Sequence, residues 1–82
     1  MFSLKIKKLE YLATNRGDLV TEDFLVSFIR ENRHLITEEN IDSLIEILEL
    51  EDPVFKDVVF KGKDPERELD TFWLKKLRSY RL

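Results

Sequence analysis

The sequence predicts an all-α fold, with a single domain over residues 1–82 built as a compact bundle of five helices. Two observations lead to this prediction. Apolar side chains recur at intervals of three and four along most of the chain, which is the spacing of helices with one buried face. Aspartate, threonine, glycine and proline interrupt that pattern at short intervals, as they do where helices begin and end. A chain of 82 residues supports one modest core, so no second domain is expected.

The first helix is predicted over residues 4–15, with a buried face made of Ile6, Leu9, Leu12 and Ala13. Gly17 follows it, where helices commonly end with a glycine in the left-handed conformation. Arg16 would then lie in the last turn, where the helix dipole favours a cation. The stretch 15–18, Asn-Arg-Gly-Asp, is therefore predicted to be a helix end that exposes a positive charge.

The second helix is predicted to begin between Asp18 and Thr21, both of which are favourable N-cap residues. Glu22 places negative charge in its first turn, where the helix dipole stabilises an anion. Arg33 and His34 are expected to close the helix. Its predicted buried stripe consists of Val20, Phe24, Leu25, Phe28 and Ile29.

The third helix is predicted to start at Thr37 as N-cap, with Ile36 and Ile41 spaced as a hydrophobic staple across that cap. Its predicted core positions are Ile41, Leu44, Ile45 and Leu48. Asp52 and Pro53 then predict a fourth helix. The aspartate would act as cap, and the proline would take the first helical position, where its missing N–H is not needed.

The fourth helix is expected to bury Phe55, Val58 and Val59 and to end at Gly62. Its β-branched end would also suit a strand, but no partner strand is visible in the sequence, so a helix is favoured. The last helix is predicted over residues 71–80, after a cap at Asp70 or Thr71. Its apolar face carries Leu69, Trp73, Leu77 and Tyr80, and basic residues gather near its C-terminal end at Lys75, Lys76, Arg78 and Arg81.

Composition and charge narrow the possible functions. The net charge of -3 disfavours nucleic-acid binding, which requires a basic protein surface. The chain has no cysteine and one histidine, so no metal site built from thiolates and imidazoles is expected. No apolar run approaches the roughly 20 residues that cross a membrane, and the N-terminus lacks the pattern of a secretion signal. We expect a monomer without membrane contact, in the cytoplasm or, in a eukaryote, in the mitochondrial matrix.

Catalytic residues are not predicted. His34 is the only base available for a Ser-His-Asp triad, and its expected place at a helix end favours a structural or solvated role. The acidic groups Glu38-Glu39 and 49–52 have the residue type for acid–base chemistry, but they fall where caps and solvated faces are expected. The basic cluster of the last helix is interpreted as a solvated helix end, with docking of an acidic partner as the alternative. An enzyme is not expected.

The order of these features resembles a known family. Its elements are Arg16-Gly17, Thr37-Glu38-Glu39, Leu48-Glu49-Leu50-Glu51-Asp52-Pro53, Gly62, Pro65, Leu69-Asp70-Thr71 and Leu74-Lys75-Lys76-Leu77. Over residues 5–80 this order is similar to the small flavinylation factors, called SdhE in bacteria and succinate dehydrogenase assembly factor 2 in mitochondria. The Leu-Glu-x-x-Asp-Pro element is the most telling part of the resemblance.

The resemblance implies a five-helix bundle that binds the flavoprotein subunit of succinate dehydrogenase or fumarate reductase. Such a factor promotes covalent attachment of FAD to a histidine of that subunit. It would be an assembly chaperone that holds no cofactor tightly and acts on an FAD-containing partner. Attachment needs the flavin methyl carbon held against the histidine, and a small protein that stabilises the right domain arrangement supplies that positioning.

The family's signature after the first helix, Arg-Gly-Met-x-Glu-x-Asp, is present in part. Arg16 and Gly17 match it, Asp18 and Val20 replace its methionine and first acid, and Glu22 replaces its final aspartate. The resemblance implies a partner-binding site at Arg16, Gly17, Asp18 and Glu22. The arginine would donate to a carboxylate or carbonyl of the partner, the glycine would allow close backbone approach, and the acids would form a rim. On this interpretation Arg16→Ala weakens partner binding and leaves stability nearly unchanged.

Two alternative functions remain open at this point. The chain would also suit an antitoxin-like or general protein-interaction module without flavinylation activity, since bacterial members of the family have been described as antitoxins. A nucleic-acid-binding helical module is the other alternative, and the negative net charge disfavours it.

Overall fold

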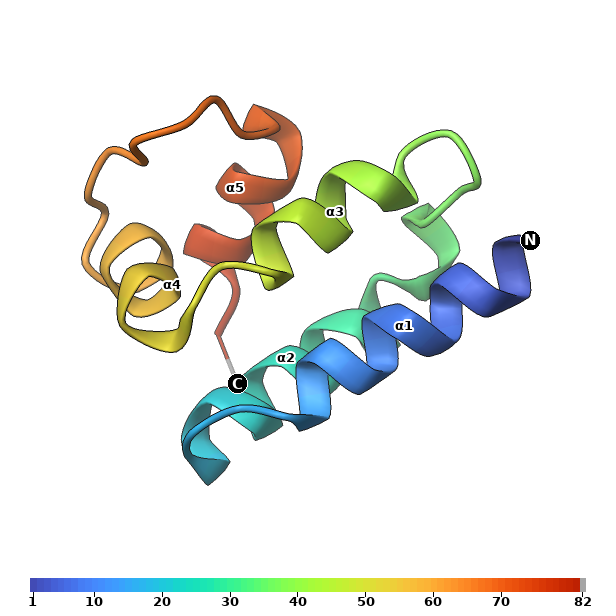
Figure 1. The fold of residues 1–82 in the computed structure, drawn as a ribbon, viewed down its shortest axis with the longest axis horizontal. Helices are drawn as coiled ribbons and strands as arrows, with labels where there is room; N and C mark the ends of the chain where they lie inside the picture. The colour runs from blue at the N-terminus through green and yellow to red at the C-terminus, as the bar shows by residue number, and fades with distance from the viewer. Residues whose placement is uncertain (82) are drawn as a thin grey trace.

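Five α-helices and one short 3₁₀ helix form the fold in the computed structural model, which describes residues 1–81 (Figure 1). They are α1 (Phe2–Thr14), α2 (Leu19–Glu31), η1 (Arg33–Leu35), α3 (Ile41–Leu48), α4 (Asp52–Val59) and α5 (Thr71–Ser79). No strand occurs within residues 1–81, so the predicted all-α five-helix architecture is confirmed. The Cα radius of gyration is 11.7 Å, and a compact chain of this length is expected to have about 12 Å.

The first two helices lie side by side as an antiparallel pair, and α3 packs against α1 (Figure 1). The fourth and fifth helices form the other side of the molecule, where α5 contacts both α3 and α4. A long connection over residues 60–70 joins α4 to α5 around the outside (Figure 1). The chain then returns toward α2, because Tyr80 packs against Phe24 and Phe28 with ring centroids 5.4 Å apart in both pairs.

The core draws side chains from all five helices. Trp73 is fully buried, its ring packs edge-on against Phe28, and its indole N–H donates to the carbonyl of Asn40 at 3.2 Å. A buried tryptophan usually needs such a partner for its polar N–H. The buried hydrophobic residues are Ile6, Leu9, Ala13, Phe24, Leu25, Phe28, Ile29, Ile36, Ile41, Leu44, Ile45, Ile47, Leu48, Phe55, Val58, Val59, Leu69, Trp73, Leu74 and Leu77. Most of the predicted core is therefore confirmed.

Two predicted caps and one predicted helix end are confirmed. The carboxylate of Asp18 accepts from the backbone N–H of Thr21 at 2.7 Å and begins α2, and Asp70 accepts from the N–H of Trp73 at 3.0 Å and begins α5. Gly62 has φ 72° just after α4, in the left-handed region that suits glycine at a helix end. The predicted ranges of the first and last helices are correct to within two residues.

Two predicted boundaries around the third helix differ from the structure. Thr37 and Asn40 cap each other, since each side-chain oxygen accepts from the other's backbone N–H, but they close only a turn, and the regular helix begins at Ile41. The second helix ends before Arg33 and His34, because the backbone and side-chain N–H groups of Asn32 both donate to Phe28. The chain then tightens into η1, where His34 is exposed.

One predicted core position is wrong. Val20 is 72% exposed, whereas its neighbour Thr21 is buried. Thr21 lies four residues before Leu25 and seven before Phe28, which places it at the centre of the buried stripe. Val20 lies one step of about 100° to the side, and there it faces solvent.

Candidate functional site

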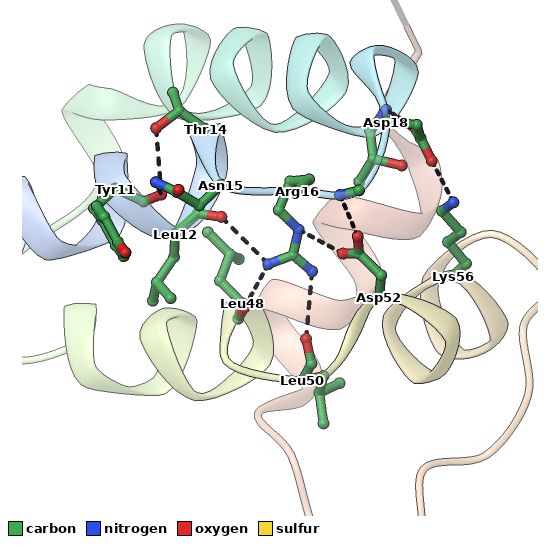
Figure 2. A network of polar contacts seen from close by, with 12 residues as sticks. Tyr11, Leu12, Thr14, Asn15, Arg16, Asp18, Leu48, Leu50, Asp52 and Lys56 are labelled. Atoms are coloured by element: carbon green, nitrogen blue, oxygen red, sulfur yellow. Dashed lines mark hydrogen bonds and ion pairs between the residues drawn. The ribbon is translucent and has the colours of Figure 1, made fainter.

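The predicted partner-binding residues lie where two connections of the chain meet. Residues 15–18 join α1 to α2, and residues 49–51 join α3 to α4. Figure 2 shows the two segments facing each other, with the side chain of Arg16 between them. We call this arrangement the junction, and define it by Arg16, Gly17, Asp18, Asp52 and Lys56.

The guanidinium of Arg16 binds backbone carbonyls from three parts of the chain. Its Nη1 donates to Leu12 at 3.2 Å and to Leu48 at 2.8 Å, and its Nη2 donates to Leu50 at 3.3 Å (Figure 2). Leu12 and Leu48 lie in the last turns of α1 and α3, where the helix leaves carbonyls without a partner. The Arg16 side chain thus provides hydrogen-bond donors for carbonyls at the ends of α1 and α3 and in the loop after α3.

The same guanidinium is held by a carboxylate and an aromatic ring. Its Nε lies 2.9 Å from Oδ1 of Asp52, but the N–H is not aligned for a hydrogen bond, so the contact is an ion pair. The guanidinium carbon lies 4.9 Å from the centre of the Phe55 ring, within range of a cation–π contact. Only 5% of the Arg16 side chain is exposed, against 24% for Asp52.

The prediction of an exposed cation at this corner is therefore wrong. The physical reason is that the carbonyls of two helix ends and the Asp52 carboxylate offer this side chain several acceptors inside the molecule. With these acceptors the guanidinium is buried without leaving its charge unpaired. Whether Arg16 also contacts a partner protein stays a prediction.

Gly17 has a role other than the predicted one. The first helix ends at Thr14, and Asn15 caps it by donating from both its backbone and its side chain to the Tyr11 carbonyl. Gly17 is not in the left-handed region. Its N–H donates to Oδ2 of Asp52 instead, and a Cβ at this position would lie 2.7 Å from that oxygen. The close approach that glycine permits is therefore made by this chain's own aspartate.

Asp52 is likewise not the predicted cap of the fourth helix. Glu51 occupies the N-cap position without a side-chain hydrogen bond, and Asp52 is already the first helical residue, followed by Pro53 in the first turn. The carboxylate of Asp52 turns away from its own helix to contact Arg16 and Gly17 (Figure 2). The Asp-Pro element thus ties the start of α4 to the corner between α1 and α2.

Asp18 completes the junction with two separate contacts. One oxygen caps α2 through Thr21, and the other pairs with the ammonium of Lys56 on α4. The hydrogen bond from Lys56, followed by that from the Thr21 N–H, lowers the pKa of Asp18 to about 2, and the same pair raises the pKa of Lys56. Glu22 lies half-buried in the first turn of α2 and forms no ion pair within residues 1–81.

The structure therefore brings together three of the four predicted site residues and adds two that the sequence reasoning missed. The sequence offered one indication for Lys56, because a residue four positions after Asp52 lies on the same face of a helix. Beside the junction, Leu19 and Val20 are 73% and 72% exposed at the start of α2.

The remaining candidates have local roles. Glu38 and Glu39 are exposed, and Glu49 pairs with Lys8 at 3.0 Å. Arg78 of the basic cluster donates to the carbonyls of Val58 and Lys63 at 2.9 Å each, so it fastens the connection between α4 and α5 instead of facing only solvent. Residues 1–81 contain no group of three side chains placed to hold a metal ion.

Comparison with family models, with curated proteins and with solved structures gives no match. A functional assignment therefore depends on the sequence pattern and on the geometry of the junction. None of the helices in residues 1–81 has the length and apolar character needed to cross a membrane. The longest two, α1 and α2, have 13 residues each.

Proposed function

We propose that this chain is an assembly chaperone of the SdhE type. In this proposal it binds the flavoprotein subunit of succinate dehydrogenase or fumarate reductase and promotes covalent attachment of FAD to that subunit. The observation that carries the proposal is the contact between Arg16-Gly17 and Asp52, which lie 35 residues apart in the chain. Asp52 belongs to the most telling element of the resemblance, and Arg16-Gly17 is the matching part of the family signature. A direct contact gives these two elements a physical reason to occur together.

A second support is that the bundle of five helices implied by the resemblance is also the observed architecture. The junction links the α1–α2 turn to the α3–α4 connection and to the first turns of α4. A corner held by several internal contacts suits a factor whose task is to hold a client in one arrangement, since less ordering is required on binding.

Within this proposal the partner meets the outer side of the corner. Leu19 and Val20 offer exposed apolar surface, and Glu22 offers a carboxylate that forms no ion pair within residues 1–81. Val20 stands where the family signature has an acid, so the contact at this position is expected to be apolar. A carboxylate introduced here would leave a charge buried against the partner without a counter-ion.

The experiment is complementation in cells that lack their own flavinylation factor. Expression of this chain is expected to restore covalent flavin on the flavoprotein subunit, measured as fluorescence of the denatured subunit in a gel. The expressed protein is also expected to co-purify with that subunit. Leu19→Asp combined with Val20→Asp is expected to abolish both. Leu4→Asp is the matched control, because Leu4 is 64% exposed on α1 at a distance in sequence from the corner.

Two outcomes contradict the proposal. If the chain neither restores covalent flavin nor co-purifies with the subunit, the flavoprotein is not its client. If it binds the subunit without any effect on flavinylation, a general protein-interaction module without flavinylation activity is the better description.

A further inference from the structure

We propose that a groove between α1 and α2 binds an acidic amphipathic helix of a partner protein. The groove has a volume of about 430 Å³, and its lining shares no residue with the junction. Ala13, Val26 and Ile29 form its apolar part, while Arg30 and Arg33 bring cations and Glu10 brings the opposite charge. This inference does not depend on the proposed function, since it concerns a different surface.

The two arginines are available to a ligand. Within residues 1–81 neither guanidinium has a carboxylate at ion-pair distance, in contrast to Arg16 and Arg67. Both side chains are exposed, and the guanidinium of Arg33 lies 5.5 Å from the ring centre of Phe2, which leaves its N–H groups uncommitted. Glu10 faces the same groove and pairs with neither arginine.

The groove carries a net positive charge, whereas the whole chain is negatively charged. The sequence has a net charge of -3, yet the lining of the groove holds two arginines against one glutamate. A guanidinium binds a carboxylate through two parallel hydrogen bonds, which gives direction as well as strength. The complementary partner is therefore acidic. The negative charge of the rest of the molecule repels such a partner, whereas the groove attracts it.

The shape of the groove favours a helix as the occupant. Two antiparallel helices bound it (Figure 1), and a third helix laid along such a pair places one apolar stripe against the floor. Arg30 lies in the last turn of α2, Arg33 begins η1, and both line the groove, so two carboxylates one turn apart on the partner helix are expected to meet them. The half-buried Val26 lines the groove one helical turn before Arg30 and receives an apolar side chain from the same partner face.

The test is a selection of helical peptides from a displayed library in which the surface positions of a fixed 15-residue helix are varied. Enriched peptides are expected to carry Asp or Glu beside an apolar stripe and to shift the methyl NMR signals of Ala13, Val26 and Ile29. Arg30→Gln with Arg33→Gln is expected to weaken binding about tenfold or more, as is replacement of the peptide acids by their amides. Arg67→Gln with Lys75→Gln, two exposed cations outside the lining of the groove, is the control and is expected to bind as wild type.

Any of four results overturns the inference. The library yields no binder, or the binders lack acidic residues, or the double variant in the groove binds as tightly as wild type. The fourth is that a free aromatic acid such as phenylacetate shifts the same methyl signals with the affinity of the peptides, which would make a small anion the occupant. Unchanged unfolding midpoints of both double variants exclude loss of fold as the cause of weaker binding.

Discussion

Replacing Arg16 by alanine is expected to destabilise the fold strongly, although the residue lies in a turn between two helices. The substitution leaves the carbonyls of Leu12, Leu48 and Leu50 without their donor and the carboxylate of Asp52 without its cation. It also removes the guanidinium that packs on the ring of Phe55. The sequence alone predicted the opposite result, with stability nearly unchanged.

The size of the effect follows from burial. Removing one partner of a buried ion pair costs about 3–5 kcal/mol, and the lower end applies here because Asp52 keeps 24% of its side chain exposed to water. A domain of 82 residues has a total stability of about 4–12 kcal/mol. A loss of about 3 kcal/mol therefore lowers the melting temperature by about 12–24 °C. With a urea slope of about 1 kcal/mol per molar, the midpoint falls by about 3 M.

The assay is urea unfolding followed by the fluorescence of Trp73, the single tryptophan, which is fully buried in the native state. Arg67→Ala is the matched control, since Arg67 pairs with Glu46 on the surface and exposed pairs contribute about 0–1 kcal/mol. In a double-mutant cycle, Arg16→Ala and Asp52→Ala together are expected to cost less than the sum of the two single changes. A free energy of unfolding for Arg16→Ala within about 0.5 kcal/mol of the wild-type value would refute the structural role of this side chain.

Three further predictions concern the junction and the aromatic cluster. Gly17→Ala pushes a methyl group to 2.7 Å from the Asp52 carboxylate and is expected to cost about 1–3 kcal/mol, so an unchanged melting temperature would contradict the close approach. The pKa of Asp18 is about 2 in the folded protein and 3.8 in the unfolded chain. Its pairing with Lys56 therefore stabilises the protein above pH 3.8, and this stabilisation is lost as the pH falls toward 2. The stability gap between wild type and Asp18→Asn, which keeps the cap, is therefore expected to be constant near neutral pH and to shrink over that window in acid unfolding curves. Burial raises the pKa of the Tyr80 hydroxyl, which lies near Glu31 and Ser27 but forms no well-aligned hydrogen bond within residues 1–81. Tyr80→Phe is therefore expected to leave stability unchanged or to raise it by up to about 1 kcal/mol in the same urea assay, and a clear loss would show that a bond to Glu31 or Ser27 forms.

Local patterns predicted the helices well because they are set by neighbouring residues. The three- and four-residue spacing of apolar side chains and the caps at Asp18 and Asp70 were enough to place α1, the start of α2, and α5. Val20 was misplaced by one position because two adjacent residues at a helix start fit the stripe almost equally well. Hydrophobicity favoured the valine over Thr21, whereas the helix geometry buried the threonine.

The candidate site was harder to predict because its contacts cross the chain. Arg16 binds carbonyls that are 32 and 34 residues away, and no local pattern states which loops will meet. A sequence ending a helix with arginine, glycine and aspartate fits an exposed corner and a buried junction equally well. Only the position of the α3–α4 connection decides between them, and that position follows from the packing of α3 against α1.

The junction also changes how a binding experiment on this protein must be interpreted. In the signature to which residues 16–22 are similar, the two matching positions, Arg16 and Gly17, contact other residues of this chain. Of the replaced positions, Val20 faces solvent and Asp18 both caps α2 and pairs with Lys56. Loss of partner binding in an Arg16 or Gly17 variant therefore reports first on the fold of the corner. Substitutions at the exposed face of α2 change the contact while leaving the corner in place, so they are the ones that test the proposed function directly.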